Sequence, residues 1–360
     1  MHFPYCKSIC NYCDFYKKPL TSGESFSQYH DILEKSFDVQ NELFENNGFT
    51  LAPLKTFYLG GGTPSLWGID GARRLEKFFN QYGIVWDNDY EATMEVNPDS
   101  FDEKTIEAWK AIGINRFSLG VQSIDPRYSK VLDRAHSVDD ALKAISFFKS
   151  RNENFSVDLM LGLPFSKEWD RNVIRELEEL LKYRPNHFSV YILTVKGDYP
   201  HLKDLPSEEW IEREYLEVSE LLKAKGYQHY EVSNFSLEGK RSNHNMQYWK
   251  NASVAALGPS ATGFLNSGDL GVRYKWKPTQ VEYIQEVLSP EQLALEQVYL
   301  GLRTSEGHKT TDKDFLNLAS QWVAKGWAHS SKEGLVKLTS QGYLILDSLM
   351  DELFRENVIK

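Results

Sequence analysis

The sequence predicts an α/β protein, a partial (β/α) barrel of the TIM type with about six parallel strands and a smaller C-terminal α+β module. Between residues 50 and 235, short apolar runs alternate with amphipathic stretches, a pattern typical of βαβ units around a parallel sheet. Polar or glycine residues follow several of these runs, at positions 60–63, 95–97, 122, 158–162 and 194. In a barrel, functional side chains gather at the rim formed by the C-terminal ends of the strands. An open, doubly wound sheet is the alternative.

The elements follow one another in a regular order. Strands are expected at residues 56–62, 91–98, 114–123, 155–164, 187–195 and 226–235. Helices are expected between them, at 72–82, 102–113, 126–133, 138–150, 167–182 and 207–225. Gly113 ends the second of these helices and is a good residue for a C-terminal cap.

After about residue 290 the pattern of expected elements changes to two helices, a short β-like segment ("LVKLT") and a final helix. This order resembles a winged-helix module. Such modules often bind DNA, but these helices carry Asp, Glu and Gln as much as Lys, so a packing role is expected. We therefore expect a barrel with an N-terminal loop over 1–235, a connecting segment over 236–289 and a winged-helix-like module over 290–360.

Composition limits the classes of function. The chain has 360 residues, 41% hydrophobic and 26% charged, which is ordinary for a globular protein. Its net charge of −10 and its scattered basic residues argue against nucleic-acid binding. No apolar run approaches the ~20 residues of a membrane span, and no signal-peptide layout is present. A cytoplasmic protein is expected; the sequence specifies neither peripheral membrane contact nor a homodimer.

The three cysteines of the chain, Cys6, Cys10 and Cys13, lie within eight residues. They are too close together to form a disulfide framework. A structural zinc ion would need a fourth ligand, from His2 or a distant histidine. A [4Fe–4S] cluster held by three thiolates would keep one iron open for a substrate. Unligated cysteines are the remaining alternative.

The spacing C-x3-C-x2-C, with Tyr12 before the third cysteine, resembles that of the radical S-adenosylmethionine enzymes. The resemblance implies that the three cysteines bind a [4Fe–4S] cluster and that Tyr12 lies at the cofactor. The open iron would be chelated by the amino and carboxylate groups of S-adenosylmethionine. An electron from the cluster would then cleave the sulfonium and give a 5′-deoxyadenosyl radical.

The same resemblance implies the rest of the cofactor site. "GGGTPS" (60–65) is similar to the element that binds the cofactor's amino group. Further positions match one subgroup, the oxygen-independent coproporphyrinogen III dehydrogenases and their relatives. The implied residues are Gly61, Gly62, Thr63, Glu95, Gln122, Arg134 and Asp158. The alternatives are a plain glycine turn, a helix-end surface charge at Arg134 and a core-edge ion pair at Glu95.

Two kinds of protein in this subgroup are possible matches for the sequence. The dehydrogenases oxidatively decarboxylate two propionates of coproporphyrinogen III, whereas the related haem chaperones bind haem and pass it to an acceptor protein. The dehydrogenases carry a fourth cysteine where this chain has Phe15, and an N-terminal extension where only five residues precede Cys6. Both features favour a chaperone. The family's first strand is cut short here, at Met1 and His2.

"NHNMQYW" (243–249) contains H-N-x-x-Y-W, which resembles the haem-binding motif of these chaperones. The resemblance implies His244 as a haem ligand, with Tyr248 and Trp249 packed against the macrocycle. The alternative is a hydrogen-bonded structural histidine. A third hypothesis is a purely structural cluster with a docking C-terminal module, which would have no use for Glu95 and Asp158 in a cofactor pocket.

Overall fold

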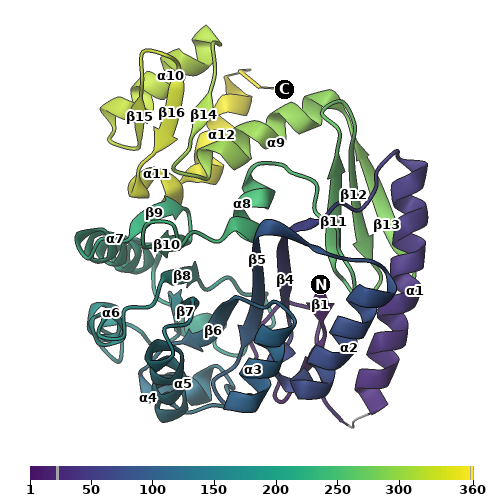
Figure 1. Ribbon diagram of the computed structural model, residues 1–360. Helices are drawn as coiled ribbons and strands as arrows, with labels where there is room; N and C mark the ends of the chain where they lie inside the picture. Colours follow the sequence, from purple (N-terminus) through teal and green to yellow (C-terminus); the bar gives the residue numbers. More distant parts are fainter. Residues whose placement is uncertain (22–23, 357, 360) are drawn as a thin grey trace.

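The computed structural model describes residues 1–21, 24–356 and 358–359 (Figure 1). Within these ranges the central sheet has eight strands in the order β1-β4-β5-β6-β7-β8-β10-β9. All neighbours from β1 to β8 are parallel. This order never reverses, as it would at the switch point of a doubly wound sheet. The predicted partial barrel of about six parallel strands is therefore confirmed.

The strands lie close to their predicted positions. The parallel set comprises β1 (His2–Phe3), β4 (Leu54–Gly61), β5 (Trp86–Val96), β6 (Arg116–Gln122), β7 (Phe155–Leu161) and β8 (His187–Ile192). The first of these is two residues long.

Helices cover the outer face of the sheet (Figure 1). They are α2 (Gly68–Gln81), α3 (Glu103–Ala111), α4 (Pro126–Val131), α5 (Val138–Ser150), α6 (Val173–Leu181) and α7 (Glu208–Ala224), with 3-10 turns at Pro64–Trp67 and Leu202–Asp204. Local sequence sets several of their starts: Asp102, Ser137 and Ser207 each accept a backbone N–H of the first turn. Helix α6 begins later than predicted, because Asn172 caps it.

The two faces of the sheet differ in chemistry. Along β7, Val157 and Leu159 are buried on one face, where they join the apolar core, while Ser156 and Asp158 alternate with them on the other. The same alternation places Thr93, Ser118 and Ser189 inside the barrel, where all three are buried. Barrel interiors are usually filled by branched apolar residues. This polar interior leaves a place for a polar ligand at the rim.

The strand expected over 226–235 is instead a hairpin, β9 (Gln228–Glu231) and β10 (Asn234–Ser236), of which β10 pairs antiparallel with β8. The expectation of one strand was wrong because the run contains its own turn. The Glu231 carboxylate accepts the N–H of Ser233 at 3.2 Å and thereby stabilises that turn.

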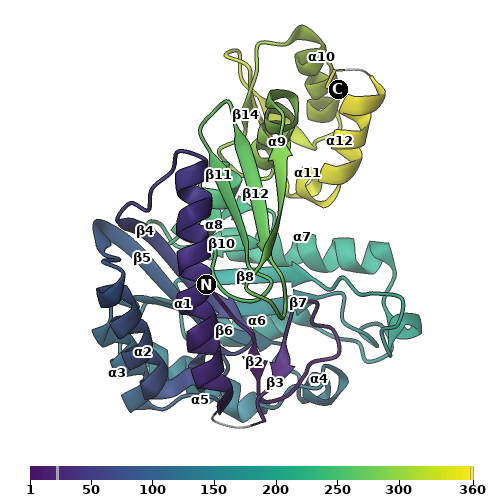
Figure 2. The same ribbon diagram turned by 90° about the vertical axis from the view of Figure 1, so that its right-hand side faces the viewer.

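The segment expected to be a connection forms α8 (Asn243–Trp249) and a three-stranded antiparallel sheet, β11 (Thr262–Asn266), β12 (Gly271–Trp276) and β13 (Tyr283–Leu288). This sheet lies beside the long helix α1 (Glu24–Asn46) in both views (Figures 1 and 2). The Tyr274 hydroxyl of β12 donates to Gln40 of α1 at 2.9 Å. Neither α1 nor this sheet is among the elements expected from the sequence.

The predicted C-terminal α+β module is present. It comprises α9 (Pro290–Leu302), β14 (His308–Lys309), α10 (Lys313–Ala324), β15 (Ala328–Ser330), β16 (Leu335–Leu338), α11 (Ser340–Leu344) and α12 (Leu346–Arg355). Its three strands pair in the order β14-β16-β15. Among the described residues, no helix combines the length and apolar character needed to cross a bilayer.

Candidate functional site

The cysteine segment is tied to the barrel by two short parallel strands, β2 (Tyr5–Cys6) and β3 (Lys18–Pro19). The N–H of Leu20 donates to the Cys6 carbonyl at 2.8 Å and closes the loop at its base. All three thiols line a cavity of about 460 Å³, which we call the cysteine cavity. Burial, together with the nearby Cys10 and Cys13, raises the pKa of the Cys6 thiol, while contact with Thr63 opposes this shift.

The glycine turn after β4 packs directly against this segment. The N–H of Gly62 donates to the Phe3 carbonyl at 2.6 Å, and that of Thr63 donates to the Tyr5 carbonyl at 2.8 Å. A Cβ atom at Gly62 would lie 2.6 Å from the Tyr5 carbonyl oxygen, so no larger residue fits without a shift. The turn therefore also fixes the position of the cysteine loop.

Two carboxylates face the cavity from neighbouring parts of the barrel. Glu95 accepts the Tyr58 hydroxyl and the Gly61 N–H, each at 2.9 Å. Burial raises the pKa of Glu95 to about 7, and the negative charge of Asp158 adds to that shift. Burial also raises the pKa of Asp158, which accepts the Ser118 hydroxyl at 3.1 Å. A bound cation would stabilise the ionised form of both carboxylates.

Arg134 joins the cysteine loop to the strand ends. Its Nη1 donates to the Tyr12 hydroxyl at 3.1 Å and lies 3.8 Å from Cys10 Sγ. Its Nη2 donates to Asn97 Oδ1 at 3.0 Å and to the Gly120 carbonyl at 2.6 Å. Nε is buried and has no hydrogen-bond partner among the described residues. A helix-end surface charge does not describe this residue.

Every residue predicted for the S-adenosylmethionine site lines the cysteine cavity: Tyr12, Gly61, Gly62, Thr63, Glu95, Gln122, Arg134 and Asp158. The cavity is also lined by three residues that were not predicted from the sequence: Tyr58, Ser118 and Tyr191. Each lies on a strand that carries or neighbours a predicted residue. The alternation of inward and outward side chains could have identified them.

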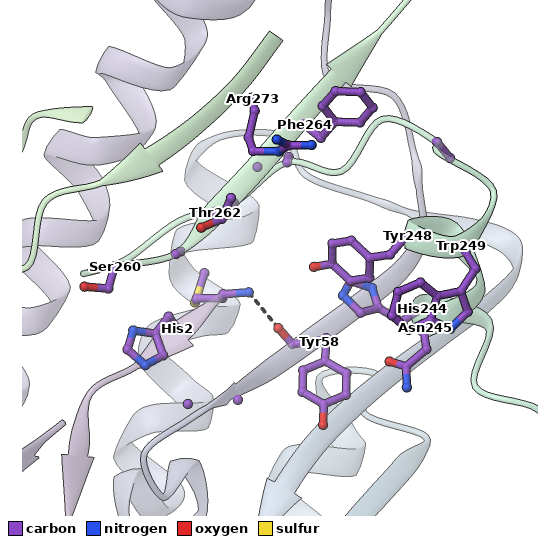
Figure 3. A pocket seen from close by; sticks show the side chains of 18 of the residues that line it. His2, Tyr58, His244, Asn245, Tyr248, Trp249, Ser260, Thr262, Phe264 and Arg273 are labelled. Carbon is purple, nitrogen blue, oxygen red and sulfur yellow. Dashed lines mark hydrogen bonds between the residues drawn. The ribbon is translucent and has the colours of Figure 1, made fainter. Parts of the chain in front are cut away.

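His244 lines a second cavity of about 740 Å³, here called the His244 cavity (Figure 3). Tyr248 and Trp249 line it too, so all three motif residues meet there. Its volume lies within the range of about 300–1,000 Å³ usual for small-molecule sites. Arg273 and Phe264 line it from the β11–β12 sheet.

The His244 side chain is held on several sides. Its Nδ1 lies 3.0 Å from the Thr56 hydroxyl, and its ring stacks on Tyr58 with centroids 5.2 Å apart. Tyr248 contacts it edge-on, also at 5.2 Å. Burial lowers the pKa of His244 to about 3. The imidazole is therefore neutral at physiological pH, which is the form that ligates metals.

Helix α8 is itself anchored to the barrel by Glu91, which is not among the residues predicted from the sequence. The Glu91 carboxylate accepts the N–H groups of Asn243 and His244, both at 3.0 Å. A carboxylate at the start of a helix accepts hydrogen bonds from N–H groups that have no partner within the helix, and its negative charge interacts favourably with the helix dipole. This contact fixes the motif relative to β5.

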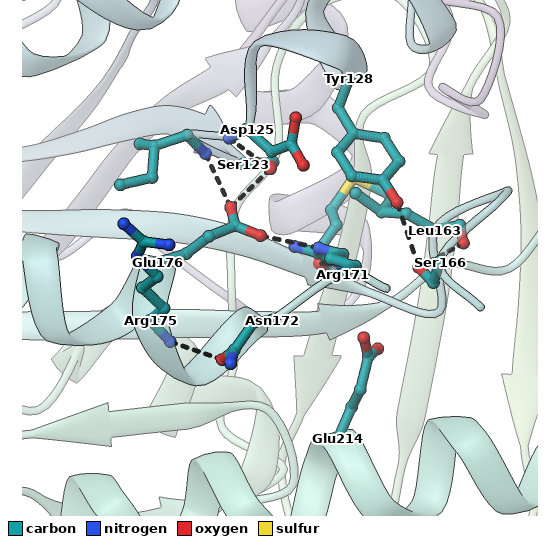
Figure 4. A network of polar contacts seen from close by, with 12 residues as sticks. Ser123, Asp125, Tyr128, Leu163, Ser166, Arg171, Asn172, Arg175, Glu176 and Glu214 are labelled. Carbon is teal, nitrogen blue, oxygen red and sulfur yellow. Dashed lines mark hydrogen bonds and ion pairs between the residues drawn. The ribbon is translucent and has the colours of Figure 1, made fainter. Parts of the chain in front are cut away.

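A buried polar network supports the strand ends that carry Gln122 and Asp158 (Figure 4). Arg171 donates to Glu176 at 2.8 Å and to the Met160 carbonyl at 2.9 Å. Glu176 also accepts the Ser123 hydroxyl at 2.5 Å and the Ile124 N–H at 2.8 Å. The network therefore holds the segments that follow β6 and end β7.

The chemistry of the donors fits a thiolate-bound cluster, since three thiols face one cavity beside a cationic Arg134. Among the described residues, no three His, Cys, Asp or Glu side chains are already grouped to hold a metal ion.

Comparison with known proteins identifies the family. A family model described as the Radical SAM superfamily matches residues 1–177. The heme chaperone HemW of Lactococcus lactis is 31% identical over 322 residues, which cover 85% of this chain and 81% of that protein. The heme chaperone HemW of Bacillus subtilis is 30% identical over 376 residues, 96% of each chain.

The structure of coproporphyrinogen III oxidase (HemN) from Escherichia coli shares the fold. Its TM-score is 0.77 at 18% identity, over 97% of this chain and 88% of that chain. The family model and these relatives show that the chain belongs to the radical S-adenosylmethionine superfamily, in the family of the HemW proteins.

Proposed function

We propose that this protein is a haem chaperone, which binds haem in the His244 cavity and transfers it to an acceptor protein. One observation carries the proposal: His244, Tyr248 and Trp249 line a cavity large enough for a ligand, directly beside the cysteine cavity. Relatives named heme chaperone HemW match most of the chain.

The family implies a [4Fe–4S] cluster and S-adenosylmethionine. Cys6, Cys10 and Cys13 would hold the cluster, which supplies one-electron chemistry when bound. Glu95 and Asp158 offer acceptors for the amino group and ribose hydroxyls of the cofactor, and the Arg134 guanidinium suits its carboxylate.

For haem, His244 offers a neutral imidazole. If Nδ1 donates to Thr56, Nε2 is left as the donor atom for iron. Tyr248 and Trp249 supply flat aromatic surface at the same cavity.

The second candidate is a coproporphyrinogen III dehydrogenase, favoured by the fold shared with HemN. Against it stands Phe15, in place of the fourth cysteine of those enzymes. Phe15 lines both cavities and is 66% exposed.

The test uses anaerobically reconstituted protein, given haem in one arm and coproporphyrinogen III with S-adenosylmethionine and reductant in another. We expect a haem Soret band that is lost in His244→Ala, and no protoporphyrinogen. His229→Ala is the control, since the half-buried His229 contacts Ser219 and Ser340 and does not line the His244 cavity. Vinyl product without stable haem binding would establish the dehydrogenase instead.

A further inference from the structure

The cysteine cavity and the His244 cavity share a wall. Both are lined by Phe15, Tyr58, Gly61, Glu95 and Tyr191. Two of these residues, Gly61 and Glu95, belong to the predicted S-adenosylmethionine site. A ligand that contacts these residues in one cavity would therefore contact groups that also border the other.

Tyr58 contacts the key group on each side of this wall. On one side its hydroxyl donates to Glu95 Oε1 at 2.9 Å, while Glu95 Oε2 accepts the Gly61 N–H. On the other side its ring stacks on His244 at an interplanar angle of 23°. A single side chain thus connects the carboxylate of one site with the histidine of the other.

The position of Tyr58 also bears on how His244 is oriented. Thr56 and Tyr58 are two residues apart on β4, so their side chains point to the same face of the strand. Thr56 lies within hydrogen-bond distance of His244 Nδ1, and Tyr58 supports the flat side of the ring. A fixed Tyr58 keeps the imidazole in one orientation, and this lowers the ordering cost of ligation.

A cation at Glu95 would change the strength of the first contact. Burial holds the pKa of Glu95 near 7, so the carboxyl is partly protonated at neutral pH. A cationic ligand favours the carboxylate. A hydrogen bond from Tyr58 to a charged acceptor is roughly twice as strong as one between neutral groups.

We infer that Tyr58 couples the two cavities, so that S-adenosylmethionine bound at Glu95 raises the affinity of the His244 cavity for haem. This inference rests on the proposed function. By linkage, haem raises the affinity for S-adenosylmethionine by the same factor.

The experiment measures haem affinity with and without saturating S-adenosylmethionine, on cluster-reconstituted protein without reductant, by titration of the Soret band. We expect the cofactor to raise wild-type affinity by at least about 5-fold, the lower end of usual coupling. In Tyr58→Phe, which keeps the ring but loses the hydroxyl, this ratio should fall to about one.

Tyr191→Phe is the matched control. Tyr191 lines both cavities, and its hydroxyl bonds with Ser189. This variant should retain the cofactor-dependent ratio. Equal or lower haem affinity with the cofactor in the wild type, or an unchanged ratio in Tyr58→Phe, would overturn the inference alone. A wild-type protein that binds S-adenosylmethionine but no haem would overturn the proposed function as well.

Discussion

Arg134 Nη1 lies 3.8 Å from Cys10 Sγ, so a permanent positive charge stands beside one of the three thiols. The same guanidinium bonds to Tyr12, Asn97 and Gly120, which hold it at this place. A fixed cation next to a cluster stabilises its reduced, more negative state. This arrangement gives Arg134 a role besides binding the cofactor carboxylate.

Arg134→Gln should therefore make the cluster's reduction potential more negative, by on the order of 100 mV at an effective dielectric constant near 20. An EPR-monitored redox titration measures this shift without S-adenosylmethionine. Arg127→Gln is the control, because Arg127 is exposed and paired with Asp125. An unchanged potential in Arg134→Gln would show that the Arg134 charge does not affect the reduction potential of the cluster.

Affinity for S-adenosylmethionine should rise between pH 6 and pH 8. The pKa of Glu95 is raised to about 7 by burial, so the carboxyl is mostly protonated at the lower pH and mostly ionised at the higher. A cationic ligand binds the ionised form and releases a proton at neutral pH. Calorimetry in buffers of different ionisation enthalpy measures that proton directly.

Glu95→Gln is the control for this pH dependence, since the amide does not titrate in this range. Its affinity should be lower at pH 8 and nearly flat with pH. Asp158, whose pKa is also raised by burial, is unchanged in this variant. A flat wild-type profile would mean that Glu95 does not meet the ligand's charge.

The barrel and its rim could be predicted because their signals are local. Along β7 the inward Asp158 alternates with outward Val157 and Leu159, and a period of two is readable from sequence alone. The hairpin at 226–235 could not be resolved in this way. Its turn depends on the Glu231 side chain bonding to Ser233, and the run carries aromatic residues on both sides of that turn.

The second cavity depends on contacts between distant parts of the chain. Glu91 caps α8 although it lies 152 residues from Asn243, and Thr56 lies 188 residues from its partner His244. No spacing in the sequence reports such pairs. The motif 243–249 could suggest His244 as a ligand residue, but only the fold shows that Tyr58 lies against it.

Gly62→Ala should displace the cysteine segment, because its Cβ would lie 2.6 Å from the Tyr5 carbonyl oxygen. Such overpacking costs about 1–3 kcal/mol in the free energy of unfolding. Urea unfolding measures that cost, and iron and sulfide analysis measures the accompanying loss of cluster. Gly197→Ala is the control, since a Cβ there meets nothing within 4 Å. Full cluster content in Gly62→Ala would show that the loop tolerates the shift.

Arg171→Met should destabilise the fold without contact to either cavity. The change leaves the Glu176 carboxylate without its buried counter-charge, and such losses cost about 3–5 kcal/mol. The denaturation midpoint in urea should fall accordingly. Arg175→Met, at an exposed position of α6, should change it little.

Adding Glu176→Gln to Arg171→Met tests the cause of that loss. If the unpaired charge dominates, the double variant should regain part of the stability, because a neutral amide costs less to bury than a lone carboxylate. If the loss comes instead from the bond between Arg171 and the Met160 carbonyl, the double variant should be no more stable than the single one. Haem and cofactor affinities, measured below the unfolding transition, then show whether this network also positions Asp158 and Gln122.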